Sequence, residues 1–120
     1  MWDVEYTDEF EVWWESLSPE AQEALAHDVE VLAAVGPGLG RPIVDSIKGS
    51  RYSNMKELRT SHAGAPLRTF FAFDPRRCAI LLIGGDKSGD PRFYERMVPK
   101  ADDLYDQHLR QLRREGLIDG

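Results

Sequence analysis

Apolar and polar residues alternate at the start of the chain and then change to a helical spacing. Residues 2–6 alternate and predict a first strand. Large apolar residues then recur at i, i+3, i+4 and i+7, which predicts the buried face of a short helix: Phe10, Trp13, Trp14 and Leu17. Thr7 is suited to cap this helix, and Ser18 followed by Pro19 begins a second one. The glycines within residues 36–40 end it, so the pattern predicts a helical hairpin.

Apolar stretches in the middle of the chain predict neighbouring strands of one sheet. In chain order these are a short strand within residues 43–47 and longer ones over residues 55–59, 67–73 and 77–84. Asp74 and Pro75 form a turn pair between the last two strands. Residues 61–66 and 84–91 are expected to be loops.

The C-terminal segment returns to a helical pattern. A helix is predicted from Arg92 onward, with Pro99 kinking or restarting it. Its apolar face comprises Ala101, Leu104, Tyr105, His108, Leu109 and Leu112. Residues 1–120 are expected to form a single domain of the α+β class: an N-terminal helical hairpin packed as one layer on a small antiparallel sheet, with a C-terminal helix.

Charge is divided unevenly along the chain. The net charge is −6, yet residues 1–40 hold ten Asp or Glu and no Lys or Arg, whereas residues 41–100 hold twelve Lys or Arg and six Asp or Glu. An acidic flank joined to a basic middle is compatible with nucleic-acid binding through one face. It is equally compatible with charges that balance locally across the folded surface.

Several classes of protein are not supported by the sequence. The lone Cys78 excludes an internal disulfide and a cysteine-based zinc cage, and its place in an apolar strand predicts a core residue. His27, His62 and His108 show no metal-ligand spacing, so neither a metal nor a cofactor is expected. The glycines of residues 36–40 follow a helix rather than a strand, which argues against a nucleotide loop. The longest apolar run is too short to cross a bilayer and no signal peptide is visible, so we expect a cytoplasmic protein.

Charged residues on the predicted strands suggest a site for phosphate chemistry. Because side chains alternate across a strand, Glu57, Arg59 and Arg68 are expected to project together from the open face of the sheet. Lys87 and Tyr94 follow the last strand and are placed to close one end of that surface. The other reading of the three strand residues is a cross-strand charge ladder that only stabilises the sheet.

Such a cluster has the parts for RNA cleavage by attack of a ribose 2′-hydroxyl. Arginine binds phosphate in a bidentate manner and neutralises the charge that builds on phosphorus. Lys87 is a candidate to protonate the leaving 5′-oxygen, and either Glu57 or a Tyr94 with a lowered pKa is a candidate base. Further basic residues are expected to contact RNA: Arg51, Lys56, Arg76, Arg77 and Arg92. For the pair at residues 76–77, a solvated hairpin tip is the alternative.

The order and spacing of these segments resemble the RelE/ParE superfamily of bacterial toxins, in particular its HigB-like, phage Gp49-like branch. The resemblance rests on the helical hairpin, Lys56-Glu-Leu-Arg59, Arg68-Thr-Phe-Phe-Ala-Phe73, Ala79-Ile-Leu-Leu-Ile-Gly-Gly-Asp-Lys87 and Phe93-Tyr94. Of the basic and aromatic positions that RelE-type enzymes use, Arg68, Lys87 and Tyr94 have matches here. Glu57 stands where those enzymes tend to carry a lysine.

This resemblance implies a RelE-like fold and a ribosome-dependent, metal-independent endoribonuclease that cuts mRNA and so inhibits translation. It also implies a helix-turn-helix antitoxin of the HigA type as partner, with a toxin–antitoxin heterotetramer as one stoichiometry that the sequence leaves open. The superfamily contains ParE-type members that inhibit DNA gyrase without cutting RNA. In that alternative the acidic helical hairpin, with its two tryptophans, is the recognition element.

Overall fold

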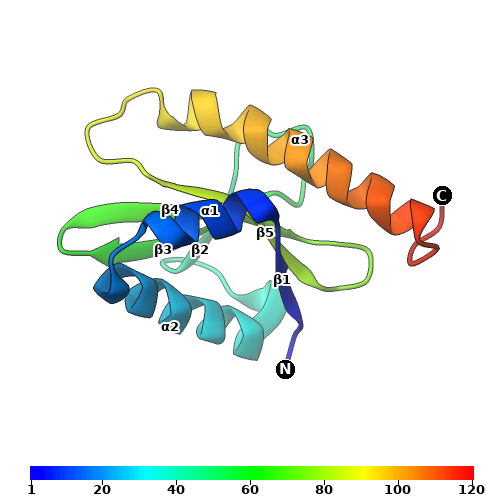
Figure 1. Ribbon diagram of the computed structural model, residues 1–120, viewed down its shortest axis with the longest axis horizontal. Coiled ribbons are helices and arrows are strands. Elements are labelled where there is room, and N and C mark those ends of the chain that lie inside the picture. The colour runs from blue at the N-terminus through cyan, green and yellow to red at the C-terminus, as the bar shows by residue number, and fades with distance from the viewer.

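A five-stranded sheet with helices on both faces forms the protein (Figure 1). The computed structural model describes residues 1–120. In chain order the elements are β1 (Val4–Tyr6), α1 (Asp8–Ser16), α2 (Pro19–Val35), a 3₁₀ turn η1 (Gly36–Gly38), β2 (Val44–Ser46), β3 (Lys56–His62), β4 (Ala65–Phe73), β5 (Ala79–Asp86) and α3 (Phe93–Arg114). The predicted α+β class, helical hairpin and C-terminal helix are confirmed.

The sheet is mixed rather than wholly antiparallel. Its strand order is β1-β5-β4-β3-β2, and every neighbouring pair is antiparallel except β1 and β5, which run parallel. The helical hairpin carries the chain from β1 at one edge of the sheet to β2 at the other edge, and β5 later pairs with β1. The expectation of an antiparallel sheet is therefore wrong at this one edge.

The helical hairpin begins and ends where its sequence signals predicted. The Thr7 hydroxyl accepts a hydrogen bond from the Phe10 amide, and the Ser18 hydroxyl accepts one from the Ala21 amide. Both therefore satisfy donors that a helix N-terminus leaves free. Gly36 ends α2 with a φ of 77°, in the left-handed region that favours glycine.

Two apolar cores lie on opposite faces of the sheet. Residues of α1 and α2 cover one face and pack on Leu58, Phe71 and Leu81. The other face carries Phe70 and Ala72, and α3 covers it (Figure 1). The predicted single layer of helices is wrong, because the apolar face of α3 requires a sheet face of its own. The face expected to be open is therefore largely buried.

Two segments are more regular than predicted. β3 and β4 extend through the expected loop and join at Ala63 and Gly64, whose φ values of 50° and 80° suit a two-residue hairpin turn. α3 continues through Pro99 without a second start. Buried side chains on either side of Pro99, such as Val98 and Ala101, anchor the helix to the sheet, and this packing outweighs the missing amide. None of the helices has the length and apolar character needed to cross a bilayer.

Candidate active site

A buried carboxylate forms the centre of the candidate site. Glu57, on β3, is 3% exposed. The Tyr94 hydroxyl donates a hydrogen bond of 2.6 Å to its Oε1. Arg59 donates to Oε2 through Nε at 3.3 Å and Nη2 at 3.2 Å, and Nε of Arg68 lies 3.4 Å from Oε1. Two guanidinium groups and one phenol thus surround a single carboxylate.

Strand register and helix placement bring these side chains together. In the β3–β4 pair Glu57 lies opposite Phe70 and Arg59 opposite Arg68, so the charged residues share the face that α3 covers. The first residue of α3, Phe93, stacks on Phe70 with ring centroids 5.9 Å apart. The ring of Tyr94 then meets Phe70 edge-on at 6.1 Å, which directs its hydroxyl at Glu57. The sequence prediction that these residues cluster is confirmed, although their burial was missed.

Asp45 is a member of the cluster that the sequence analysis missed. It lies opposite Glu57 in the β2–β3 pair, and its Oδ2 accepts a hydrogen bond of 3.1 Å from Nη2 of Arg59. Arg59 therefore bridges two carboxylates. Only the β2 register places Asp45 there, and a three-residue strand gives a weak sequence signal for register.

Arg68 is the less completely paired of the two arginines that surround Glu57. Its side chain is 12% exposed, and Nη1 donates to the Leu67 carbonyl at 3.1 Å. The contact of its Nε with Glu57 lacks hydrogen-bond geometry, which leaves Nε buried with no acceptor. An unsatisfied buried donor is uncommon in folded proteins, and it means that the Arg68 guanidinium is held to Glu57 less firmly than that of Arg59.

The environment of Tyr94 raises the pKa of its phenol. Burial is the largest cause, and the hydrogen bond to Glu57 and the charge of Glu57 act in the same direction; the Arg68 guanidinium opposes them. The expectation of a lowered Tyr94 pKa is therefore wrong. At neutral pH the phenol keeps its proton, and its hydroxyl donates a hydrogen bond to Glu57.

Lys87 lies at one end of the cluster, as predicted. Its Nζ is 5.8 Å from the centroid of the Tyr94 ring, a cation–π arrangement. Lys87 forms no ion pair. Its ammonium group is thus free to meet an anion beside Tyr94.

Two of the residues expected to contact RNA lie away from this cluster. Arg51 forms ion pairs with Asp103 and Asp106 of α3. Lys56 neighbours Glu57 in sequence and so points to the other sheet face, where its Nζ donates to the Pro37 carbonyl at 3.4 Å.

The other three residues of that group occupy two places. Arg76 pairs with Asp74 and with Glu5 on β1, in both cases at 2.8 Å. Arg77 stacks on the Trp2 ring at 5.2 Å. Both belong to the β4–β5 turn, whereas Arg92 is exposed and immediately precedes α3. Of the five, only Arg92 adjoins the segment that carries Tyr94.

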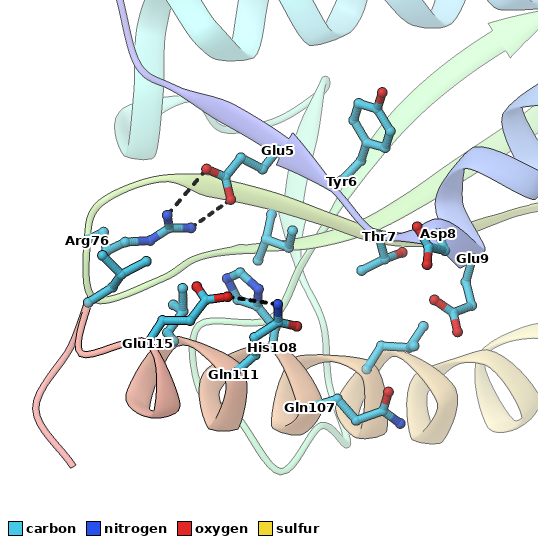
Figure 2. A pocket seen from close by; sticks show the side chains of 14 residues that line it. Glu5, Tyr6, Thr7, Asp8, Glu9, Arg76, Gln107, His108, Gln111 and Glu115 are labelled. Atoms are coloured by element: carbon cyan, nitrogen blue, oxygen red, sulfur yellow. Dashed lines mark hydrogen bonds and ion pairs between the residues drawn. The ribbon is translucent and has the colours of Figure 1, made fainter.

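A second buried carboxylate holds the β4–β5 turn against α3. Asp74 accepts hydrogen bonds from Arg76 and from the backbone amide of Arg76, and Nε2 of His108 lies 2.9 Å from its Oδ2. Burial favours the neutral acid, but the hydrogen bonds from Arg76 and His108 outweigh it and lower the pKa of Asp74. His108 and Arg76 also line a pocket of about 570 Å³ between β1 and α3 (Figure 2). The prediction of His108 as a histidine at the core edge is confirmed.

The remaining reactive side chains are structural. Cys78 is buried, which raises the pKa of its thiol to about 11. Trp13 fills the space above Gly84 and packs on Phe10 with Trp14. Trp13 is thus not freely presented for recognition, whereas Trp14 lines an apolar groove beside β1. No group of three or more His, Cys, Asp or Glu side chains is arranged to hold a metal ion.

The fold and cluster define a small α+β protein with a buried Glu–Arg–Tyr constellation at the start of its last helix. The sequence profile of the phage-derived Gp49-like proteins matches residues 12–106. The chain belongs to this family.

Two proteins of Mycobacterium tuberculosis are similar to the chain. One, named "Putative toxin HigB2", is 43% identical over 101 residues, which is 82% of this chain and 50% of that protein. The other, named "Putative toxin HigB3", is 46% identical over 93 residues, which is 77% of this chain and 80% of that protein. The chain therefore spans about half the length of the first relative and most of the second. The resemblance to the HigB-like branch is confirmed.

Proposed function

We propose that this protein is the toxin of a type II toxin–antitoxin system and that it cuts mRNA on the ribosome as a metal-independent endoribonuclease. The names of two relatives with more than 40% identity support the toxin class. The main support for the activity is the cluster around the buried Glu57. Its carboxylate accepts a hydrogen bond from the Tyr94 hydroxyl and lies beside an incompletely paired Arg68. Its setting is the cytoplasm, where ribosomes are available.

In the proposed reaction the ribose 2′-oxygen attacks phosphorus and the bond to the 5′-oxygen breaks. Tyr94 takes the 2′-hydroxyl proton on its oxygen while its own proton moves to Glu57 across the 2.6 Å hydrogen bond. This relay explains how a phenol with a raised pKa can assist deprotonation, since no free phenolate is formed. The products are a 2′,3′-cyclic phosphate and a 5′-hydroxyl.

The cations stabilise the charge that develops in this step. Arg68, whose side chain is partly exposed beside Glu57, binds the phosphate through its terminal nitrogens as the charge on the phosphate increases. Lys87 carries no ion pair and supplies a proton to the leaving 5′-oxygen. Arg59 is held by Glu57 and Asp45, so its first role is to fix the carboxylate. Holding these groups in place before RNA arrives lowers the cost of orienting them.

Binding of mRNA involves residues beyond the cluster. Arg92 is exposed next to α3 and is suited to a neighbouring phosphate. Arg51, Lys56, Arg76 and Arg77 have partners within the free protein, so each must exchange a partner to bind RNA. We assign most substrate positioning to the ribosome, and we expect a HigA-like helix-turn-helix antitoxin to neutralise the protein.

A translation reaction tests this function. Purified ribosomes, a defined mRNA and the protein are combined, and cleavage is read by primer extension. We expect cuts in phase with codons that require the ribosome, vanish in Arg68→Ala and persist in Arg110→Ala. Arg110 is an exposed arginine of α3 without an ion pair, and so serves as the matched control.

Two results would contradict the proposal. One is intact mRNA with normal translation in the presence of the wild-type protein. The other is equal cleavage by Arg68→Ala at equal soluble concentration. Normal translation would direct attention to the ParE-like alternative, which a DNA gyrase supercoiling assay tests directly.

A further inference from the structure

The outer edge of β1 has backbone groups with no strand beside them. β1 is the terminal strand of the sheet. On its inner side, the Ala79 amide donates to the Asp3 carbonyl at 2.9 Å and the Thr7 amide donates to the Leu81 carbonyl at 3.0 Å. Because backbone groups alternate in direction along a strand, the amides and carbonyls of Val4 and Tyr6 point outward. This edge is a template for one more strand.

An apolar groove of about 580 Å³ lies on one side of this edge, towards the helical hairpin. Side chains of β1, α1 and α2 line it, among them Val4, Tyr6, Phe10, Trp14 and Val29. Tyr6 is 58% exposed, although its ring lies only 6.0 Å from that of Phe10. The groove therefore leaves apolar surface uncovered beside the free backbone groups.

The pocket of Figure 2 lies on the other side of the same edge, towards α3. Glu5 and Thr7 point to this side, whereas Tyr6 points away from α3 (Figure 2). A strand added to β1 would likewise alternate its side chains between the two pockets. Every second side chain would meet the apolar groove, and those between would meet polar surface.

The charge around both pockets is acidic. Glu11, Glu15 and Glu30 line the apolar groove, and Asp8 and Glu9 line the other pocket. None of these five carboxylates forms an ion pair within the chain. No Lys or Arg occurs in residues 1–40 to offset them, and Arg76, which lines the second pocket, is already paired with Glu5 and Asp74. A partner that covers this edge must therefore supply the cations.

We infer that β1 binds an extended segment of a partner protein in which apolar residues alternate with Lys or Arg, and that this segment adds a sixth strand to the sheet. Backbone hydrogen bonds to Val4 and Tyr6 supply the register, the groove accepts the apolar side chains and the carboxylates select the cations. The inference goes beyond the proposed function, because RNA cleavage uses no atom of β1. β5 and β4 separate this edge from Glu57 on β3, so the segment and RNA can bind at the same time.

Nuclear magnetic resonance of the ¹⁵N-labelled 120-residue protein tests the inference. The probe is an acetylated peptide, Lys-Val-Lys-Val-Lys-Val-Lys, compared with a peptide of the same composition in which the four lysines precede the three valines. We expect the alternating peptide to shift amide signals within residues 3–15 and to slow hydrogen exchange of the Val4 and Tyr6 amides. Equal responses to both peptides, or no response at about 1 mM, would overturn the inference.

Two charge-reversal variants distinguish binding at this surface from nonspecific attraction between a basic peptide and an acidic protein. Glu15 lines the groove, and Glu15→Lys is expected to weaken peptide binding about tenfold. Glu23→Lys makes the same change on an exposed position of α2 that lines neither pocket, and should leave binding within about twofold. Equal weakening by both substitutions would show attraction to net charge and would overturn the assigned surface. Cleavage of mRNA is measured separately, so failure of one proposal leaves the other intact.

Discussion

Buried carboxylates connect parts of this chain that are distant in sequence. Glu57 on β3 accepts a hydrogen bond from Tyr94 of α3. Asp74, which follows β4, contacts His108 in the second half of the same helix. Asp102, 2% exposed, accepts a hydrogen bond of 2.8 Å from the Arg51 amide and so orders the loop before β3. Each of these carboxylates has at least one hydrogen-bond partner from another part of the fold. Their cost of burial is offset only while those partners stay in place.

Replacing Asp74 tests this view through the pH dependence of stability. Asp74→Asn removes the charge that Arg76 and His108 contact, and we expect a loss of about 2–4 kcal/mol at pH 7. The folded pKa of Asp74 is lower than its ordinary 3.8, so the wild-type carboxylate stabilises the fold above that value. This contribution is lost as pH falls through the folded pKa. Urea denaturation between pH 7 and pH 3 should therefore show the two proteins converging at low pH. A constant difference in unfolding free energy would contradict this account.

Tyr94 allows folding and chemistry to be separated at one residue. Tyr94→Phe keeps the ring contacts with Phe70 and Phe93 and removes the hydroxyl that donates to Glu57. We expect unfolding free energy to fall by about 1 kcal/mol and ribosome-dependent cleavage to fall about 10²- to 10⁴-fold. Thermal melts and primer extension measure the two effects on one preparation. Full cleavage by the variant would exclude the proton relay, whereas a collapse of stability would assign the hydroxyl a structural role.

The part of the candidate site that depends on the alternation of side chains along strands was predictable from the sequence. The shared face of Glu57, Arg59 and Arg68 follows from their spacing, and the place of Lys87 and Tyr94 follows from chain order. The burial of Glu57 did not follow, because it depends on α3 crossing that face. The raised pKa of the Tyr94 phenol is a consequence of the same burial.

At the scale of elements, the contact between α1 and β5 relies on the absence of a side chain. Gly84 lies under the Trp13 ring, and a Cβ at this position would be 2.1 Å from Cζ3 of that ring. Gly85 is similarly close to Phe93 of α3, at 2.9 Å from its Cε1. Consecutive glycines thus let helices approach β5 from both faces. Glycine pairs are typical of a turn, which is what the sequence predicts here, yet β5 continues to Asp86.

Gly84→Ala should displace α1 from the sheet. Since the Trp13 ring is packed against Phe10, it cannot move away freely, and we expect a loss of about 1–3 kcal/mol in unfolding free energy. Gly40→Ala is the matched control, because no atom lies within 4 Å of a Cβ built there. Chemical denaturation monitored by tryptophan fluorescence compares the variants. Equal stability of the two would indicate that the Trp13 contact does not constrain α1.

Local signals explain which elements the sequence analysis found. Capping at Thr7 and Ser18 and the apolar spacing of α1, α2 and α3 act over a few residues, so the helices were predicted well. The parallel pairing of β1 with β5 joins residues about 75 positions apart, and no local pattern encodes it. The prediction that all helices lie in one layer failed for the same reason.

At the scale of the whole molecule, the sheet separates two apolar cores. The lone thiol is buried where the β4–β5 turn enters the sheet. Cys78 is 5% exposed and immediately precedes β5, the strand that contacts β1, β4, α1 and α3. Because β5 contacts four other elements, we expect access to the sulfur to require unfolding of the chain. Burial also raises the pKa of the thiol to about 11, which keeps the thiolate scarce at neutral pH.

Thiol labelling should consequently report global unfolding. At pH 8 we expect a disulfide reagent to react with native Cys78 at least about a hundredfold more slowly than with the unfolded chain. The labelling rate in increasing urea should follow the loss of helical circular dichroism. Rapid labelling of a protein with native circular dichroism would reveal a local opening of the β4–β5 turn and contradict the expected coupling.

The pairing of β1 with β5 also bears on when the protein becomes complete during its synthesis. β1 leaves the ribosome first, but its only strand partner lies at Ala79–Asp86. The candidate site needs Glu57, Arg68 and Tyr94, which three successive elements deliver in that order. At about 5–20 residues per second, a nascent chain therefore spends several seconds with its first strand unpaired and its candidate site unassembled. Under the proposed function, chain order therefore shields the ribosome that makes this protein from its product until α3 has emerged.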